Sequence, residues 1–269
     1  MARRGVVLVT GASSGIGKAT AGLLSERGYT VFGTSRRPEA QSMNGFEMVS
    51  LEVASEGSVA AYVQAVLGRA GRVDVLVNNV GTGVFGAAEE ISVDEVKGLF
   101  EINFFGAVRV TNAVLPIMRE QRSGRIINMS SPGGVAGIPF NAVYCASKFA
   151  LEGYAESLRH EVRPFGIYVS IVEPTGVRTS AAERVPRATH SIEAYAAVRE
   201  RVNENFIRSM RSGMDPRLVA ETVLQIIEND TPRLRYTVGR QAAMVSLMRR
   251  TLPQGLFERV VRRVFGLDH

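Results

Sequence analysis

Short runs of apolar, mostly β-branched residues alternate along the chain with longer stretches in which apolar residues return every three or four positions. The short runs predict strands over residues 5–10, 30–35, 46–53, 73–79, 124–130, 166–174 and 234–239. The longer stretches predict helices over residues 17–28, 55–71, 92–121, 142–162 and 215–230. Strands and helices that alternate in this way predict a mainly parallel sheet covered by helices on both faces.

The alternation continues through most of the chain and predicts a single α/β domain over residues 1–269. Two stretches fit it least. Residues 180–214 are interpreted as a helical insertion that covers the substrate site, and residues 239–269 as a helical C-terminal extension. Ligands of doubly wound parallel sheets bind beyond the carboxyl ends of the strands, so the functional residues are expected there.

The composition indicates a buried core and no membrane span. About 45% of the 269 residues are hydrophobic, and no stretch approaches the roughly 20 apolar residues that a span needs. The apolar run near the N-terminus is too short for a signal peptide and opens onto a glycine-rich turn. A single cysteine, Cys145, excludes an internal disulfide and fits a reducing compartment, so we expect a cytoplasmic protein.

The net charge of +6 is concentrated late in the chain, in residues 235–269. Such a basic surplus suits a nucleic acid, an anionic lipid or an anionic substrate, and it is also what a solvated helix face contributes. No zinc-finger spacing or RNA-binding aromatic motif accompanies it, so no nucleic-acid partner is expected. His160, His190 and His269 lack the spacing of metal ligands, so no metal is expected either.

A glycine-rich turn follows the first predicted strand, where VVLVTGASSGIGKAT places Gly11, Gly15 and Gly17 before a helix. Glycine lets the backbone approach a ligand closely, and the N–H groups of the helix start attract a pyrophosphate. The G-x-x-x-G-x-G spacing differs from the usual G-x-G-x-x-G motif, and a P-loop is excluded because no Gly-Lys-Ser/Thr closes the turn. The turn indicates a dinucleotide, with a purely structural packing turn as the alternative.

The second predicted strand ends in Ser35, Arg36 and Arg37, without the acidic residue that binds the ribose hydroxyls of NAD. Guanidinium groups suit the 2′-phosphate of NADP. The sequence therefore predicts a preference for NADP(H), with NAD(H) as the second choice. The alternative is that both arginines merely face solvent.

Tyr144 stands four residues before Lys148, so the two side chains share one face of the predicted helix 142–162. A free tyrosine has a pKa of about 10, and a neighbouring ammonium group lowers it. A tyrosine tuned in this way can exchange a proton with a substrate oxygen while a hydride moves to or from the adjacent carbon. Ser131 follows the strand 124–130, where its hydroxyl can bind the same oxygen. Tyr-x-x-x-Lys alone is a weak signal, because chance matches are frequent.

In this order, the motifs resemble those of the short-chain dehydrogenases/reductases over residues 5–180. The matching segments are TGASSGIG at 10–17, VLVNNVG at 75–81, EINFFGAVRVT around Asn103, Ser131, YCASK at 144–148 and EPTGVRT at 173–179. The segment GIPFNAVYCASKFALEG, residues 137–153, is most similar to the branch of 17β-hydroxysteroid and retinol dehydrogenases. The resemblance implies a single Rossmann-type doubly wound sheet, and a homodimer or homotetramer.

The resemblance also implies roles for individual residues. Tyr144 is expected to be the general acid in reduction and the base in oxidation, with Lys148 lowering its pKa and binding the nicotinamide ribose. Ser131, rather than Ser130, is expected to orient the substrate carbonyl, and Asn103 to support a water-linked proton relay to Lys148. The residues expected to bind the cofactor are Gly11, Ser13, Ser14, Gly15, Ile16, Gly17, Ser35, Arg36, Arg37, Glu52, Val53, Asn79, Gly81, Tyr144, Lys148, Pro174, Val177 and Thr179.

Within this set, Asn79 is expected to approach the adenine-side ribose through its backbone, and Val177 and Thr179 to hold the nicotinamide carboxamide. Three departures from the family pattern leave the catalytic set intact. Val80 replaces the usual alanine, Glu52 replaces the aspartate that meets the adenine amino group, and Thr175 replaces a glycine near the nicotinamide.

The expected activity is the interconversion of a ketone or aldehyde with an alcohol. Gly137, Ile138, Pro139 and Phe140, with the segment after Thr179, suggest an apolar pocket for a steroid, a retinoid or a similar small molecule. A 3-oxoacyl thioester is an alternative substrate. A non-catalytic nucleotide-sensing protein is a further alternative, although a pure binder does not need the whole catalytic set.

The C-terminal segment MVSLMRRTLPQGLFERVVRRVFGL, residues 244–267, is amphipathic and basic. Three roles suit it: it can cover the substrate mouth, join a neighbouring subunit or touch an anionic membrane surface.

Overall fold

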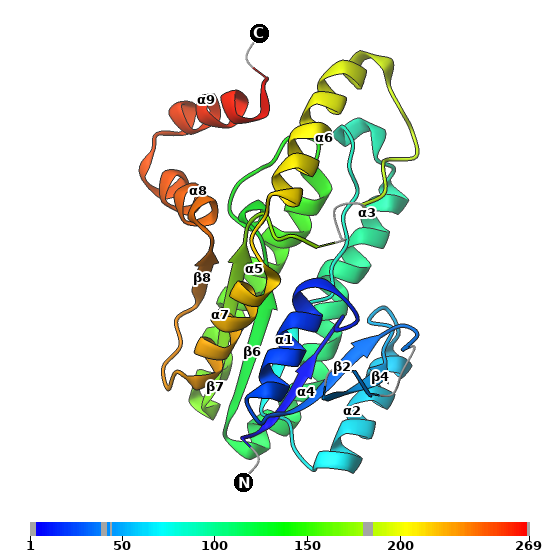
Figure 1. Ribbon diagram of the computed structural model, residues 1–269, viewed down its shortest axis with the longest axis vertical. Coiled ribbons are helices and arrows are strands. Elements are labelled where there is room, and N and C mark those ends of the chain that lie inside the picture. The colour runs from blue at the N-terminus through cyan, green and yellow to red at the C-terminus, as the bar shows by residue number, and fades with distance from the viewer. Residues whose placement is uncertain (1–3, 39–41, 44, 180–184, 268–269) are drawn as a thin grey trace.

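One mainly parallel sheet forms the centre of the computed structural model, which describes residues 4–38, 42–43, 45–179 and 185–267 (Figure 1). Its strands are β1 (Val6–Val9), β2 (Thr30–Ser35), β3 (Ser42–Met43), β4 (Phe46–Ser50), β5 (Val75–Asn78), β6 (Gly124–Met129), β7 (Ile167–Pro174) and β8 (Arg235–Val238). The strand order is β3-β4-β2-β1-β5-β6-β7-β8, and β3 pairs antiparallel with β4 while the other described pairs are parallel. This confirms the expected doubly wound α/β fold.

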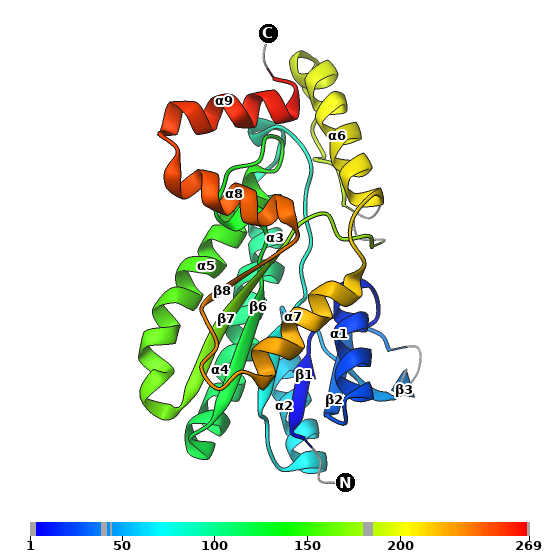
Figure 2. The same ribbon diagram turned by 60° about the vertical axis from the view of Figure 1, so that its left-hand side comes forward.

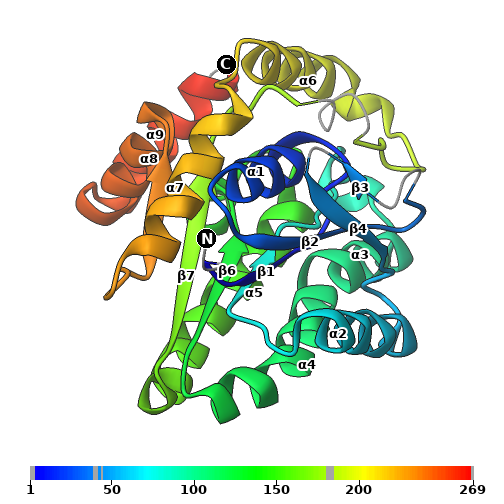
Figure 3. The ribbon, with the colours of Figure 1, turned by 60° about the horizontal axis from the view of Figure 1, so that its bottom comes forward.

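Helices cover both faces of the sheet. They are α1 (Gly15–Glu26), α2 (Glu56–Ala70), α3 (Val93–Phe100), α4 (Gly106–Gln121), α5 (Ala142–Val162), α6 (Ala196–Arg211), α7 (Pro216–Glu228), α8 (Arg240–Thr251) and α9 (Gln254–Phe265). Figure 3 shows α1 and α7 on one side of the sheet and α2, α4 and α5 on the other. Local sequence sets several ends: the Asp215 side chain accepts a hydrogen bond from Arg217 N at the start of α7, and Gly71 (φ 71°) ends α2.

The central strands β1 and β5 are buried along their whole length because helices cover both faces of the sheet. In β1, Val7 and Val9 pack in the layer of α1 and α7, whereas Val6 and Leu8 pack in the layer of α2, α4 and α5. This division follows from the two-residue period of a strand, which sends successive side chains to opposite faces. Each buried strand therefore supplies apolar side chains to the helical layer on either face of the sheet.

The strand order reverses around β1, which lies between β2 and β5. Chain connections leave this point in opposite directions, and the crevice between them lies at the carboxyl ends of the strands. The residues that follow β1, β5 and β6, among them Gly11, Asn79 and Ser131, stand along this edge. The sheet thus gathers segments that are far apart in the sequence.

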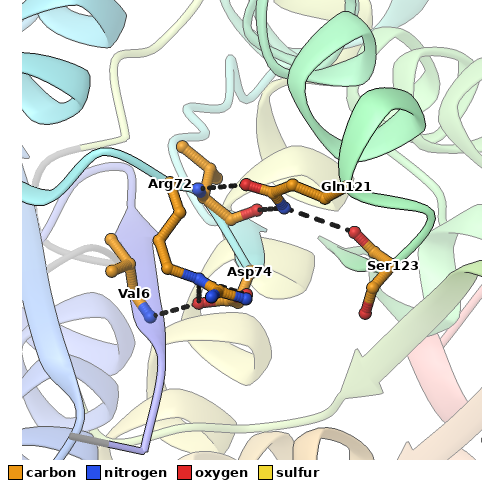
Figure 4. A network of polar contacts seen from close by, with 6 residues as sticks. Val6, Arg72, Asp74, Gln121 and Ser123 are labelled. Atoms are coloured by element: carbon orange, nitrogen blue, oxygen red, sulfur yellow. Dashed lines mark hydrogen bonds and ion pairs between the residues drawn. The ribbon is translucent and has the colours of Figure 1, made fainter.

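Polar contacts hold together the amino ends of the central strands, on the side of the sheet opposite this crevice (Figure 4). The Asp74 carboxylate accepts a hydrogen bond from Val6 N at 2.7 Å and forms an ion pair with Arg72 at 2.6 Å. Gln121, at the end of α4, accepts from Val73 N at 3.1 Å and donates to Val73 O at 2.7 Å. These bonds join the amino ends of β1 and β5 to α4 on the side away from the expected site.

The predicted continuous helix over residues 92–121 is wrong in one respect. The structure divides it into α3, a π-helical turn over Glu101–Phe105, and α4. A π turn inserts one extra residue into a helix, and such turns are frequent at functional sites. The predicted strand 46–53 is also shorter, because β4 ends at Ser50.

The two stretches that fitted the alternation least are partly helical. The first contains the 3₁₀ turn Glu193–Tyr195 and α6, and the second contains α8 and α9. Residues 180–184 of the expected substrate-covering insertion and residues 268–269 of the extension lie outside the described residues. Within the part of the chain that the structure describes, no helix combines the length and the apolar character needed to cross a membrane.

Candidate active site

Three glycines shape the turn between β1 and α1. Gly11 (φ 68°) and Gly15 (φ 55°) adopt left-handed backbone conformations that favour glycine. A Cβ atom on Gly17 would lie 2.2 Å from the Gly11 carbonyl oxygen, so no side chain fits there. Ser14 precedes α1 without a side-chain cap, which leaves the positive end of the helix for an anionic group. Ser13, Ser14 and Ile16 belong to this turn, as the motif requires.

Asn79 fastens the glycine turn to the end of β5. Its side-chain amide donates hydrogen bonds to Thr10 O at 2.9 Å and to Gly11 O at 3.1 Å. The Thr10 hydroxyl accepts from Asn79 N at 2.9 Å and from Val80 N at 3.1 Å. The side chain of Asn79 thus shapes the turn, a role that the sequence reasoning did not assign to it.

A cavity of about 720 Å³ opens beside the glycine turn at the ends of β2 and β4. Arg36 and Arg37 line it and are exposed, and neither has an ion-pair partner among the described residues. The buried Ser35 hydroxyl in its wall has no hydrogen-bond partner. The cavity lining brings together five of the expected cofactor residues, Ser13, Ser35, Arg36, Arg37 and Glu52, with Pro38 and Met48 beside them. Val53 is buried next to this region.

Tyr144 and Lys148 occupy one face of α5. The Lys148 ammonium lies 5.8 Å from the centre of the Tyr144 ring and donates a hydrogen bond to Met129 O at 2.8 Å. Lys148 is 4% exposed, and burial lowers its pKa to about 8, although the nearby Glu152 carboxylate acts in the opposite direction. A Cβ atom on Gly81 would lie 3.5 Å from this ammonium, so the backbone of Gly81 approaches it closely.

The pKa of Tyr144 departs from the sequence-based expectation. Burial raises it above the ordinary tyrosine value, while a hydrogen bond with Ser131 acts to lower it. A neighbouring ammonium group alone would lower the pKa of Tyr144, whereas desolvation of the phenol raises it. Tyr144 is therefore protonated at neutral pH in the protein without cofactor.

Ser131 sits in the tight turn between β6 and α5. It precedes the 3₁₀ turn Pro132–Gly134, and its hydroxyl accepts a hydrogen bond from Gly133 N at 3.2 Å. A Cβ atom on Gly133 would lie 3.3 Å from Tyr144 Cε1, so this turn packs directly against the tyrosine ring. Ser130 is buried beside Glu152 instead. The turn that follows Ser131 thus packs against Tyr144, whereas Ser130 lies next to Glu152.

Asn103 lies in the π turn and is 1% exposed. Its amide donates hydrogen bonds to Thr82 O at 2.9 Å and to Ser147 Oγ at 3.0 Å, and its oxygen accepts from Thr82 N at 2.8 Å. Ser147 precedes Lys148 on α5. Asn103 thus joins the segment after β5 to the catalytic face of α5, close to the lysine named in the expected relay.

The loop after β7 folds over the glycine turn. Val177 is buried and forms an isolated bridge with Met214, and Gly176 O accepts a hydrogen bond from Met214 N at 2.6 Å. A Cβ atom on Gly15 would lie 3.1 Å from Thr179 Cγ2. Thr179, one of the two residues expected to hold the carboxamide, therefore lies against the glycine turn, and Val177 lies two residues before it in the same loop.

Aromatic side chains gather around Phe140, which stands four residues before Tyr144 in the chain. Phe140 lies 6.1 Å from Phe85 and 6.3 Å from Tyr195 between ring centres, and Phe85 lies 6.4 Å from Phe206 of α6. Backbone bonds join the same segments, since Phe85 N donates to Pro186 O at 2.9 Å. The cluster connects the segment before α5 to the start of the insertion and to α6.

Cys145 is a packed residue, as predicted. It is buried, its sulfur accepts a hydrogen bond from Ile138 N at 3.3 Å, and burial raises the pKa of the thiol. A reactive thiol requires the opposite shift, so Cys145 serves the fold. No cluster of three or more His, Cys, Asp or Glu suited to a metal occurs among the residues that the structure describes.

Two buried glutamates behind the site escaped the sequence reasoning. Glu173, the residue before Pro174, is fully buried, and neither carboxylate oxygen has a hydrogen-bond partner. Arg235 of β8 lies 3.7 Å from Glu173 and 3.0 Å from both Glu152 and Glu156. Burial, with the neighbouring Glu152 charge, raises the pKa of Glu173 to about 7, while Arg235 lowers it only in part. The one available signal was a glutamate at the end of an apolar strand.

The raised pKa of Glu173 gives a pH dependence of stability with a defined sign. Between pH 4.5 and about 7 the folded protein holds a proton that the unfolded chain has lost, so this group lowers stability as the pH rises. Glu173→Gln removes this titratable carboxyl. The free energy of unfolding of the variant, relative to wild type, is expected to rise by up to about 3 kcal/mol as the pH rises from 5 to 8. Urea unfolding at pH 5 and at pH 8 measures this difference. Glu156→Gln, which also contacts Arg235 but is exposed, is the control; an equal gain there would contradict the assignment.

Comparison with known proteins decides the family. A family model described as short chain dehydrogenase matches residues 5–189. The chain belongs to the short-chain dehydrogenase/reductase family. It is 38% identical to a 3-ketodihydrosphingosine reductase of Bacteroides thetaiotaomicron, over 97% of this chain and 98% of the relative. It is 35% identical to human 17-beta-hydroxysteroid dehydrogenase type 1, over 98% of this chain and 87% of that protein.

Solved structures of this family share the fold. A short-chain dehydrogenase from Streptomyces avermitilis superposes with a TM-score of 0.84 at 35% identity, covering 98% of this chain and 99% of the other. A family member from Burkholderia phymatum in complex with NAD gives 0.79 at 26% identity, with coverage of 91% and 92%. A metagenomic oxidoreductase in complex with NADP gives 0.69 at 28% identity, with coverage of 87% and 96%.

Membership establishes the reaction class. The protein is an oxidoreductase that acts on alcohol and ketone groups with a nicotinamide cofactor. Its glycine turn, Tyr144, Lys148 and Ser131 all lie toward the carboxyl ends of the strands.

Proposed function

We propose that this oxidoreductase transfers a hydride between NADP(H) and a carbonyl or alcohol group of an apolar substrate, with Tyr144 as the general acid and base. The observation that carries the proposal is that Tyr144 shares a helix face with the buried Lys148 and packs against the turn that follows Ser131. This arrangement provides one proton donor and one hydrogen-bond donor for a single substrate oxygen.

The residues present suit a dinucleotide. The tight turn that Gly17 permits and the uncapped start of α1 favour a pyrophosphate, and the unpartnered Ser35 hydroxyl favours a polar group in the cavity beside it. Arg36 and Arg37 would hold a 2′-phosphate there, and Val177 and Thr179 the carboxamide. When bound, the nicotinamide would supply or accept the hydride.

In reduction, the Tyr144 hydroxyl donates its proton to the carbonyl oxygen as the carbonyl carbon gains the hydride. The Ser131 hydroxyl donates a hydrogen bond to the same oxygen and orients it. Lys148 favours the phenolate that remains, because its positive charge stabilises the negative one. Asn103, through its bonds to Thr82 and Ser147, holds the segment in which water would return a proton toward Lys148. In oxidation Tyr144 accepts the proton instead.

Arg36 and Arg37 predict the choice of cofactor. We expect kcat/KM with NADPH to exceed that with NADH, because no carboxylate stands at the end of β2 and two unpaired guanidinium groups do. R36Q/R37Q is expected to lower kcat/KM for NADPH by about 10–100-fold, since a hydrogen bond to a charged group contributes about 1.5–3 kcal/mol. The value for NADH should change only a few-fold.

Steady-state kinetics with both cofactors measure this difference. R27Q/R119Q is the matched control, because both arginines are exposed and lie outside the cavity. A wild-type preference for NADH, or an equal loss with both cofactors, would contradict the NADP(H) assignment.

The aromatic cluster supports an apolar substrate. Phe85, Phe140, Tyr195 and Phe206 form one cluster that includes the segment just before Tyr144, and apolar rings favour an apolar partner. Two relatives are named for lipophilic substrates, 3-ketodihydrosphingosine and a 17-beta-hydroxysteroid. We infer a steroid-like, retinoid-like or long-chain carbonyl compound. A panel of such compounds, with a 3-oxoacyl thioester and small polar ketones, tests the inference through the absorbance of reduced nicotinamide.

We further infer that residues 1–269 act as one cytoplasmic NAD(P)-binding domain that forms a homodimer or homotetramer. Phe105 and Phe149 are each 45% exposed, one in the π turn and the other on α5, and these elements pack together. Exposed aromatic side chains on two elements that pack together suit a contact between subunits. A monomer mass in sedimentation equilibrium would contradict it.

A further inference from the structure

The basic charge of the protein is concentrated on α8 and α9. Residues 240–267 contain six arginines and one glutamate, in a chain whose net charge is +6. Arg262 and Arg263 of α9 are exposed, and neither has an acidic partner among the described residues. The reaction proposed above does not use this charge.

The same two helices expose large apolar side chains. Met244 and Leu247 of α8 are 51% and 62% exposed, and Leu256 and Val264 of α9 are 42% and 65% exposed. These are half of the eight exposed large apolar side chains in the described part of the chain. Exposed apolar groups among arginines, rather than among acids, distinguish this region from an ordinary solvated surface.

Helical spacing places the apolar and basic groups together. Met244, Leu247 and Arg250 follow one another at intervals of three residues, so they share a face of α8. Leu256, Arg263 and Val264 stand at intervals of seven and eight residues, so they share a face of α9. Phe257 stands seven residues before Val264, on the same side of α9, and it anchors the start of the helix because it is buried under the Arg249 guanidinium at 5.5 Å.

Both helices lie next to the active site. α8 packs against the turn Pro132–Gly134 that follows Ser131, and Gly266 O at the end of α9 accepts a hydrogen bond from Arg201 of α6 at 2.9 Å. Figures 1 and 2 both draw α8 and α9 at the same end of the molecule as α6. A surface that docks through these helices therefore lies close to the substrate-covering segment.

We propose that α8 and α9 form a docking face for the surface of an anionic lipid bilayer. A symmetric contact with a second copy would set the arginines of one subunit against those of the other, which like-charge repulsion disfavours. Anionic headgroups neutralise the arginines, and the acyl region receives Met244, Leu247, Leu256 and Val264. The face stands apart from the reaction proposed above, so its test needs no turnover.

Vesicle co-sedimentation of the full-length protein tests this docking face. Vesicles of phosphatidylcholine with 30% phosphatidylglycerol are expected to bind the protein, and vesicles of phosphatidylcholine alone are not. Binding should fall strongly at 0.5 M salt, because salt screens the arginines. R262Q/R263Q is expected to weaken the partition by about 25-fold, at about fivefold per arginine. L247S/V264S is expected to weaken it at least about tenfold, because apolar area is lost.

Matched controls separate the face from general surface effects. R27Q/R119Q removes two exposed arginines, one just after α1 and one in α4, and V93S/L218S removes two exposed apolar side chains from α3 and α7. Both should bind vesicles like wild type. The proposal is overturned if wild type does not bind anionic vesicles, or if the control variants lose as much binding as R262Q/R263Q and L247S/V264S. It is also overturned if R262Q/R263Q changes the mass in sedimentation equilibrium and leaves vesicle binding unchanged. Carbonyl reduction of a water-soluble substrate should be the same in all four variants.

Discussion

Tyr144→Phe is expected to lower kcat for carbonyl reduction by about 10²–10⁴-fold, the range that a positioned general acid contributes. The substitution removes only the hydroxyl that carries the proton. The ring and its contact with the Pro132–Gly134 turn remain, so the fold and the cofactor crevice are kept. Rates from the absorbance of reduced nicotinamide, together with fluorescence titration of NADPH, separate the loss of chemistry from a loss of binding.

Tyr154→Phe is the matched control for this experiment. Tyr154 lies on the same helix and is also partly buried, and burial raises its pKa to about 12, but it contacts Phe104 rather than Ser131. Its kcat should stay within a few-fold of wild type. Retained turnover in Tyr144→Phe, or an equal loss in Tyr154→Phe, would remove Tyr144 from the proposed role.

The sheet and the main site could be predicted because their signals are local. All four residues of β1 are buried, so the strand appears in the sequence as a short continuous apolar run, which is typical of a central parallel strand. Tyr144 and Lys148 meet on α5 because an interval of four residues defines a helix face. Parallel strands then bring the glycine turn and Ser131 to the same edge, whatever their separation in sequence.

The π turn at Asn103 could not be predicted because its cause is not local. The residues around it keep a helical pattern, and the turn is set by hydrogen bonds from Asn103 to Thr82 and Ser147, which lie 21 and 44 residues away. The same holds for the Glu173 carboxylate, which shares Arg235 with Glu152 across α5, β7 and β8. The raised pKa of Tyr144 belongs here too, since desolvation depends on packing that the i, i+4 spacing does not report.

Gly17→Ala is expected to weaken NADPH binding by about 10–1000-fold. The added Cβ would meet the Gly11 carbonyl oxygen at 2.2 Å and the Asn79 amide nitrogen at 2.5 Å, so either the turn or the start of α1 must move. Such a shift takes N–H groups away from the pyrophosphate, and each charge-assisted hydrogen bond contributes about 1.5–3 kcal/mol. Fluorescence titration of reduced cofactor measures the dissociation constant directly.

Gly22→Ala provides the control within the same helix. A Cβ there meets no atom within 4 Å, and alanine favours a helix by about 1 kcal/mol over glycine, so this variant should bind cofactor normally and unfold at a slightly higher temperature. Circular dichroism checks that both variants fold. Thermal unfolding then shows whether Gly17→Ala destabilises α1 or only displaces the glycine turn. If Gly17→Ala binds NADPH as Gly22→Ala does, the pyrophosphate does not lie on the glycine turn, and the cofactor must approach the sheet by another route.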